Sequence, residues 1–153
     1  MDVLIINALL NSLMNVLSTM ANLVPKPGDP IAKKDNLARG EVTGLLDMES
    51  DIAKGSMAIS FTTGFIKSLV KRMVGDEIKQ VDDTAKDLTG EMANMIVGGA
   101  KAILSEKGID ISMSTPQVLS GNKHEINHKY PGQTVILPFK SEEGEFFLEI
   151  NFV

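Results

Sequence analysis

Three stretches of the chain repeat their apolar residues at the spacing of an amphipathic helix. The first covers residues 7–22, where leucine and methionine recur with polar residues between them. The second covers residues 65–73 and stops before Gly75. The third and longest covers residues 82–107, with acidic residues in its first turn and Gly108 directly after its last turn. We therefore predict three helices, the third being the longest.

Between and after these helices, the pattern changes to the short alternation of apolar and small residues that is typical of β-strands. Residues 25–30 hold three prolines and one glycine, which predicts a connecting loop. The predicted fold is α+β, with long helices packed on an antiparallel β-sheet in a single domain, residues 1–153. The predicted strands are a hairpin-like pair at 39–47 and 56–61, then 117–120, 134–139 and 145–152.

Composition narrows the classes of partner and chemistry that fit this chain. The 153 residues are enough to bury one core without disulfides or metals. A formal net charge of -5 repels the nucleic-acid backbone, so we expect no nucleic-acid partner. The sequence has no cysteine, which excludes disulfides, thiol catalysis and thiolate metal sites.

The apolar stretch at residues 3–23 is interrupted by asparagine and serine side chains, so we predict no membrane span there. No basic segment precedes this stretch, and no small-residue cleavage site closes it, as a secretory signal would require. We expect a cytoplasmic protein without a membrane partner.

One face of the third predicted helix carries a polar stripe. At about 100 degrees per residue, Asp87, Glu91, Asn94 and Gly98 fall on one side of this helix. A glycine inside a helix lowers helix stability by about 1 kcal/mol relative to alanine. The presence of glycine at position 98 therefore requires an explanation. Close approach by another protein surface is such an explanation. For Gly99, tight packing of this helix against the sheet is an equally good explanation.

The segment from Asp87 to Lys101, followed by Thr115 to Gly121, resembles the signature of the CheC, CheX and FliY phosphatases. Their pattern is Asp or Ser, then Glu, then Asn at this spacing, with a proline further along the chain. The resemblance extends over roughly residues 1–152 and is greatest to the CheX branch. Members of the CheC branch carry the Glu and Asn pair on two helices, whereas Ser12 stands here at the first Glu position. The resemblance thus implies a CheC-like fold, one active surface per chain and a homodimer formed through sheet strands.

The same resemblance implies that the third helix lies over the active site of a phosphorylated CheY-type response regulator. Asn94 would sit beside the phosphoryl group and orient the attacking water, and Glu91 would pair with the regulator's active-site lysine. Asp87 and Gly98 would belong to the partner-binding surface. Mg²⁺ would be carried by the regulator, so the chain is expected to need no cofactor or metal of its own. This assignment suits phosphoryl transfer, in which the catalyst mainly positions a water in line.

Two other functions are open at this point. One is a non-catalytic docking module for response regulators on the same fold. The other is a zinc metalloprotease, because His124, Glu125 and His128 match the His-Glu-x-x-His pattern. That pattern requires a helix and a third ligand, whereas Gly121 and Pro131 bracket only a short segment that precedes strands. We therefore expect no metal here and interpret the segment as a surface loop or sheet edge. Ser12 and Asn15 are expected to face solvent or a subunit contact.

Overall fold

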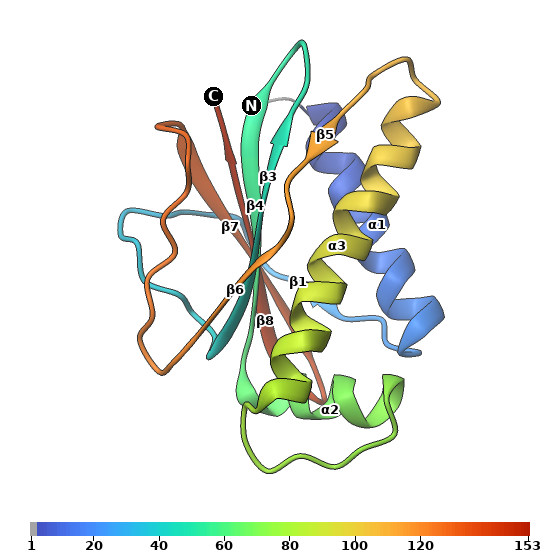
Figure 1. Cartoon of the computed structure of the whole chain (residues 1–153), viewed down its shortest axis with the longest axis vertical. Helices are drawn as coiled ribbons and strands as arrows, with labels where there is room; N and C mark the ends of the chain where they lie inside the picture. Colours follow the sequence, from blue (N-terminus) through green and yellow to red (C-terminus); the bar gives the residue numbers. More distant parts are fainter. Residues whose placement is uncertain (1–2) are drawn as a thin grey trace.

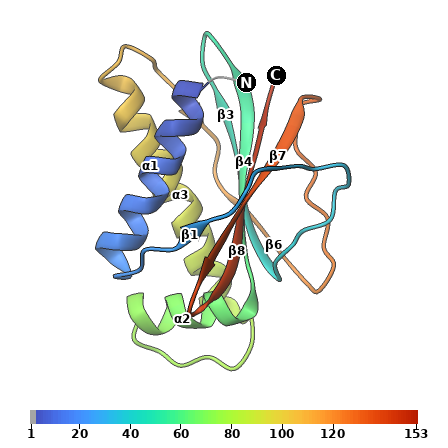
Figure 2. The ribbon, with the colours of Figure 1, turned by 180° about the vertical axis from the view of Figure 1, so that it is seen from behind.

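A single β-sheet divides the protein into a helical side and a loop side. The structure is a computed structural model and describes residues 3–153. All three helices lie on one face of the sheet, and the long connections before β3 and after β6 lie on the other (Figure 1). The view from behind shows the same separation (Figure 2).

The three helices form where the sequence predicts them. The side chain of Asp82 caps the third helix by accepting a hydrogen bond of 3.0 Å from the backbone N–H of Ala85. That helix stops just before Gly108, whose φ of 78° lies in the left-handed region that favours glycine. The helices are α1 (Val3–Met20), α2 (Thr63–Met73) and α3 (Asp83–Ser105).

The sheet has eight strands, and every pairing in it is antiparallel. Its order is β1-β7-β8-β4-β3-β5, with β2 also beside β7 and β6 also beside β3. The strands are β1 (Lys26–Pro27), β2 (Ile31–Ala32), β3 (Val42–Glu49), β4 (Lys54–Phe61), β5 (Ser112–Met113), β6 (Gln117–Ser120), β7 (Gln133–Ser141) and β8 (Gly144–Phe152).

The α+β fold with an antiparallel sheet is confirmed, and three short strands are additions to the prediction. The proline-rich segment 25–30 was expected to be only a connecting loop, which is wrong because β1 lies inside it and pairs with β7; β2 follows directly after it and also pairs with β7. Two-residue strands carry too little periodicity to be recognised in a sequence. Proline fits there because β1 and β2 lie at the edge of the sheet, where an N–H is not needed on both sides.

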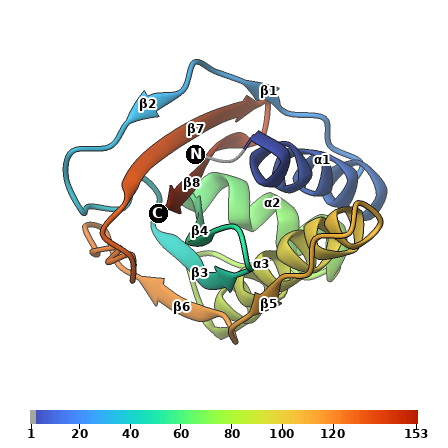
Figure 3. The ribbon, with the colours of Figure 1, turned by 90° about the horizontal axis from the view of Figure 1, so that it is seen from above.

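The core lies between the helices and the sheet, which curves around them when seen from above (Figure 3). Four phenylalanines bind α2 to the sheet. The ring centroids of Phe65 and Phe146 are 4.6 Å apart, and those of Phe139 and Phe146 are 4.8 Å apart. Phe61 stacks on Phe65 at 5.7 Å. Such aromatic clusters contribute both buried area and favourable ring geometry, so they fix α2 at one end of the sheet.

The α1–α3 contact corrects two predictions. Ser12 is only 3% exposed, and its hydroxyl donates a 2.6 Å hydrogen bond to the Ile96 carbonyl. The expectation that Ser12 faces solvent or a subunit is therefore wrong, although Asn15 is exposed. A Cβ on Gly99 would lie 2.2 Å from Ser12 Oγ. Gly99 thus allows close packing, but against α1 and not against the sheet.

The first helix is long and apolar enough to cross a membrane by length and composition. In this fold, however, its apolar face packs into the core, where Ile5, Leu9, Leu13 and Leu17 are at most 1% exposed. A core helix of this composition passes the same test as a membrane span. The structure therefore accounts for the buried apolar face of α1 through packing.

Candidate functional site

The polar stripe predicted on α3 faces away from the core. Asp87, Glu91 and Asn94 are all exposed, while Met92 and Ile96 on the other side are fully buried. This follows from the period of 3.6 residues per turn, which places positions 87, 91 and 94 close to one line along the helix. The structure thus brings the three predicted polar residues together on one accessible surface.

The stripe borders a groove between α3 and the segment that leads into β6. Pairing of β6 with β3, for example Val118 opposite Gly44, holds this segment beside the helix. Gly90 lets the two elements approach, since a Cβ there would lie 3.2 Å from Val118 Cγ2. The groove has a volume of about 450 Å³ and is lined by Lys86, Asp87, Gly90, Glu91, Asn94, Thr115, Pro116 and Val118.

The charged and amide groups of this groove are free to bind a partner. Within residues 3–153, no ion pair or side-chain hydrogen bond engages Asp87, Glu91 or Asn94. A carboxamide can donate and accept hydrogen bonds at once, and a carboxylate can pair with a cation. Because these groups point outward, the reacting group must come from another molecule. The arrangement suits a surface that acts on a macromolecule.

Gly98 lies one turn after Asn94 and is half-buried. A Cβ built on it meets no atom within 4 Å. Nothing in the chain's own packing therefore requires glycine at this position. This distinguishes Gly98 from Gly99, which is needed by the α1–α3 contact.

Sequence reasoning missed the other side of the groove. Thr115 and Val118 lie more than twenty residues from Asn94 along the chain, so no helical or strand period connects them with it. Lys86 was missed because it lies beside the stripe of acidic and amide residues and not on it. The available signal was the family resemblance, which includes the segment from Thr115 to Gly121 with its proline at Pro116 but assigns this segment no place beside the helix.

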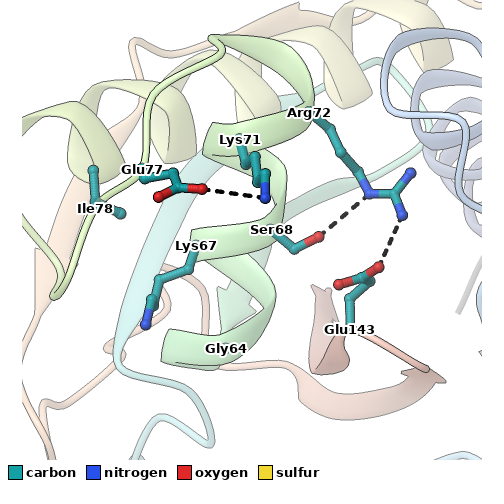
Figure 4. A pocket seen from close by; sticks show the side chains of 8 residues that line it. All are labelled: Gly64, Lys67, Ser68, Lys71, Arg72, Glu77, Ile78 and Glu143. Carbon is teal, nitrogen blue, oxygen red and sulfur yellow. Dashed lines mark hydrogen bonds and ion pairs between the residues drawn. The ribbon is translucent and has the colours of Figure 1, made fainter.

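A larger hollow of about 580 Å³ lies at α2, away from this groove (Figure 4). Its charges neutralise one another: Lys71 Nζ is 3.2 Å from Glu77 Oε1, and Arg72 Nη2 is 2.8 Å from Glu143 Oε1. The hydrogen bond from Arg72 also lowers the pKa of the Glu143 carboxyl below its usual range. Since four of its five charges are already paired, this hollow has little unmatched charge to attract a ligand.

The segment that matches the zinc protease pattern forms a loop on the opposite face of the sheet. It contains no helix, as predicted, and both histidines serve internal hydrogen bonds. The ring of His124 bonds to the Gly121 carbonyl through Nδ1 at 2.9 Å and to Thr43 Oγ1 through Nε2 at 2.7 Å. In residues 3–153, no group of three histidine, aspartate or glutamate side chains is arranged to hold a metal ion. The geometry of a zinc protease is therefore not formed.

The second histidine belongs to a buried charge network. Glu149 on β8 is fully buried, and its carboxylate accepts from Lys33 Nζ at 2.8 and 2.9 Å and from His128 Nε2 at 3.0 Å. Lys33 and His128 come from two different loops, so one carboxylate ties both loops to the centre of the sheet. A buried carboxylate is stable only when it is paired and hydrogen-bonded in this way. His128 thus has a structural explanation.

Comparison with known proteins identifies relatives over the whole chain. The family model for the chemotaxis phosphatase CheX matches residues 42–140. The CheY-P phosphatase CheX of Thermotoga maritima is 27% identical over 99% of this chain and 98% of its own length. A crystal structure of a CheC-like superfamily protein from Shewanella sp. PV-4 is 47% identical, with a TM-score of 0.92 over 100% of this chain and 99% of that one. The chemotaxis protein CheX from Vibrio vulnificus is 45% identical, with a TM-score of 0.88 over 97% and 99% of the two chains.

The fold also recurs at low identity. A crystal structure of a CheX–CheY–BeF3–Mg complex from Borrelia burgdorferi is 19% identical, with a TM-score of 0.79 over 96% of both chains. At this level of identity the likeness shows the fold.

Proposed function

This chain belongs to the CheX family of chemotaxis phosphatases, and on that premise we propose that Asn94 and Glu91 on α3 are its catalytic residues. The resemblance inferred from the sequence is confirmed at the level of the family. The protein is a phosphatase that hydrolyses the aspartyl phosphate of a CheY-type response regulator in chemotaxis signalling. The observation that carries the residue assignment is the exposed, unpaired Glu91–Asn94 pair beside the groove formed with residues 115–118.

In this mechanism the side chain of Asn94 enters the regulator's active site and orients the attacking water. Its carbonyl oxygen accepts a hydrogen bond from the water, while its amide group donates to a neighbouring oxygen. The transition state of phosphoryl transfer is loose, so holding the water in line supplies most of the acceleration. An amide does this without adding negative charge near the phosphoryl group, whereas a carboxylate would repel it.

Glu91 pairs with the lysine of the regulator's active site. It lies one turn before Asn94 on the same exposed face, so a partner that meets one side chain also meets the other. A charge-assisted hydrogen bond strengthens as docking excludes water. Glu91 therefore contributes to both docking and alignment.

Asp87 and Gly98 extend the partner-binding surface on either side of this pair. Asp87 adds a second carboxylate one turn before Glu91. Gly98, one turn after Asn94, has no side chain, so the partner can approach the helix closely there. The magnesium ion that neutralises the phosphoryl charge is carried by the regulator, so this chain supplies no cofactor.

The decisive experiment follows the decay of a purified response regulator labelled on its aspartate with ³²P, with and without this protein. Acceleration at substoichiometric protein supports catalysis, since one molecule must then process many. The alternative is a non-catalytic docking module, which would bind the phosphorylated regulator and leave its decay rate unchanged. Running the host's regulators in parallel identifies the substrate.

We also propose a homodimer in the cytoplasm, as the resemblance to CheX implies. The sheet offers two outer sides, formed by β1 and β2 at one end and by β5 and β6 at the other. Unpaired strand edges favour association with a second chain. Light scattering after size exclusion should give twice the chain mass of 16.5 kDa, and a single chain mass would contradict the dimer.

A further inference from the structure

The α3 side of the groove beside Asn94 carries charges of both signs. Lys86 and Glu91 both line it, yet neither forms an ion pair within residues 3–153. The proposed function uses Glu91 and leaves Lys86 without a role. Five residues along a helix rotate the side chain by about 140 degrees, so Lys86 lies towards β6 while Glu91 faces outward.

A second hollow continues the groove past Lys86. It has a volume of about 310 Å³ and is also lined by Lys86, together with Lys79, the last residue of β6, Ser120, and the following Gly121. The carboxylate of Glu41 in this hollow is already engaged, accepting hydrogen bonds from the backbone N–H and hydroxyl of Thr63 at 2.9 and 3.0 Å. The two hollows together make an extended surface with unmatched positive charge at one end. Such a surface suits a protein partner better than a small molecule.

Distance decides what Lys86 can contact. It precedes Asn94 by eight residues, which corresponds to about 12 Å along the helix axis. A lysine side chain has only a four-carbon stem, so its ammonium group does not reach a phosphoryl group held at Asn94. Lys86 must therefore act on the rim of the docked partner and not on the reacting atoms.

Building on the proposed function, we propose that Lys86 binds a carboxylate on the rim of the regulator's phosphorylation site. On α3, the regulator's lysine would then meet Glu91 and its acidic side chain would meet Lys86. A regulator docked in the reverse direction would bring like charges together at both places, which disfavours that orientation. Lys86 is thus a specificity-determining residue that selects a regulator with an acid at this position.

The test is a charge reversal, Lys86→Glu, with Lys67→Glu as its matched control. Lys67 is exposed on α2 and lies outside the groove, so both variants change the net charge equally. We expect Lys86→Glu to raise KM about tenfold at low salt with kcat nearly unchanged, because an interfacial charge pair governs association more than chemistry. The difference between the two variants should shrink as salt is added, since rim charges are screened.

A compensating change on the regulator makes the test specific. Acidic residues on the rim of its phosphorylation site, outside the phosphorylated aspartate and the magnesium ligands, are replaced by lysine one at a time. One of these regulators should restore a low KM with Lys86→Glu and raise KM with the parent protein. A loss of structure cannot produce such a reversal. Lys86→Ala removes the charge without reversing it, so its KM should lie between those of the parent protein and Lys86→Glu.

Three results would overturn the inference: equal KM values for Lys86→Glu and Lys67→Glu, a fall in kcat with KM unchanged, or no regulator variant that restores binding. A parent protein that fails to accelerate decay refutes the proposed function itself. An active parent with an unaffected Lys86→Glu variant refutes only the role of Lys86.

Discussion

Replacing Gly98 with lysine separates docking from stability more sharply than any other change on α3. The position lies one turn after Asn94 on the exposed side of the helix, and a Cβ there meets no atom within 4 Å. The chain can therefore accept a Cβ at this site without rearrangement. A regulator lying over Asn94 and Glu91 would meet the new side chain directly.

The expected change in stability follows from helix propensity alone. Glycine is less favourable than lysine inside a helix by somewhat less than about 1 kcal/mol. For a domain of this size, a gain of that order raises the melting temperature by about 2–4 °C. Since no clash opposes this gain, Gly98→Lys should melt no lower than the parent protein.

The phosphatase activity should change in the opposite direction. A long side chain would hold the regulator away from the helix, and displacement of the reacting groups by about 1 Å can already cost a hundredfold in rate. We expect Gly98→Lys to lose at least that much acceleration of decay. Gly98→Gln adds similar length without charge and should behave alike, which separates bulk from electrostatics.

The neighbouring glycine is the matched control. A Cβ at Gly99 would lie 2.2 Å from Ser12 Oγ, and the Ser12 hydrogen bond to Ile96 would be disturbed. Gly99→Ala should therefore be destabilised by about 1–3 kcal/mol in urea unfolding, the usual cost of overpacking. If Gly98→Lys unfolded like Gly99→Ala, Gly98 would serve internal packing. If Gly98→Lys stayed folded and fully active, the docking surface would lie elsewhere on the protein.

Four further substitutions test the catalytic pair and the buried network. Asn94→Ala should lower kcat by at least about a hundredfold while leaving regulator binding largely intact, and unchanged turnover would refute the mechanism. Glu91→Ala should weaken binding and turnover together, by about tenfold in KM; a fall in the maximal rate alone would exclude its docking role. His128→Ala should lower the unfolding free energy by about 1–3 kcal/mol, because Glu149 loses a hydrogen bond. Its phosphatase activity should stay near normal, and elemental analysis of the purified protein should find no stoichiometric zinc. Glu149→Ala should cost about 3–5 kcal/mol in urea unfolding because Lys33 is left buried and unpaired, and a value near zero would contradict the importance of this ion pair.

The sequence by itself determined the elements of the fold and the exposed pair on α3. Helical periods and their stop signals depend on neighbouring residues, so the three helices and the longer strands were predictable within a few residues. The alignment of Glu91 and Asn94 is likewise a property of one helix, which needs no other part of the chain. Their chemical role came from the resemblance to a family, because an exposed Glu-x-x-Asn pair has no distinctive chemistry of its own.

Only the tertiary structure decided which groups surround that pair and which serve packing. Ser12 looks like a solvent-facing residue in the sequence, yet the approach of α1 to α3 buries it beside Gly99. Lys33, His128 and Glu149 are distant in the chain and become one buried network through the sheet register and two loops. The groove likewise exists because β6 pairs with β3 and brings Val118 to Gly90. Contacts between residues far apart along the chain have no local period, so chain topology and burial determine them.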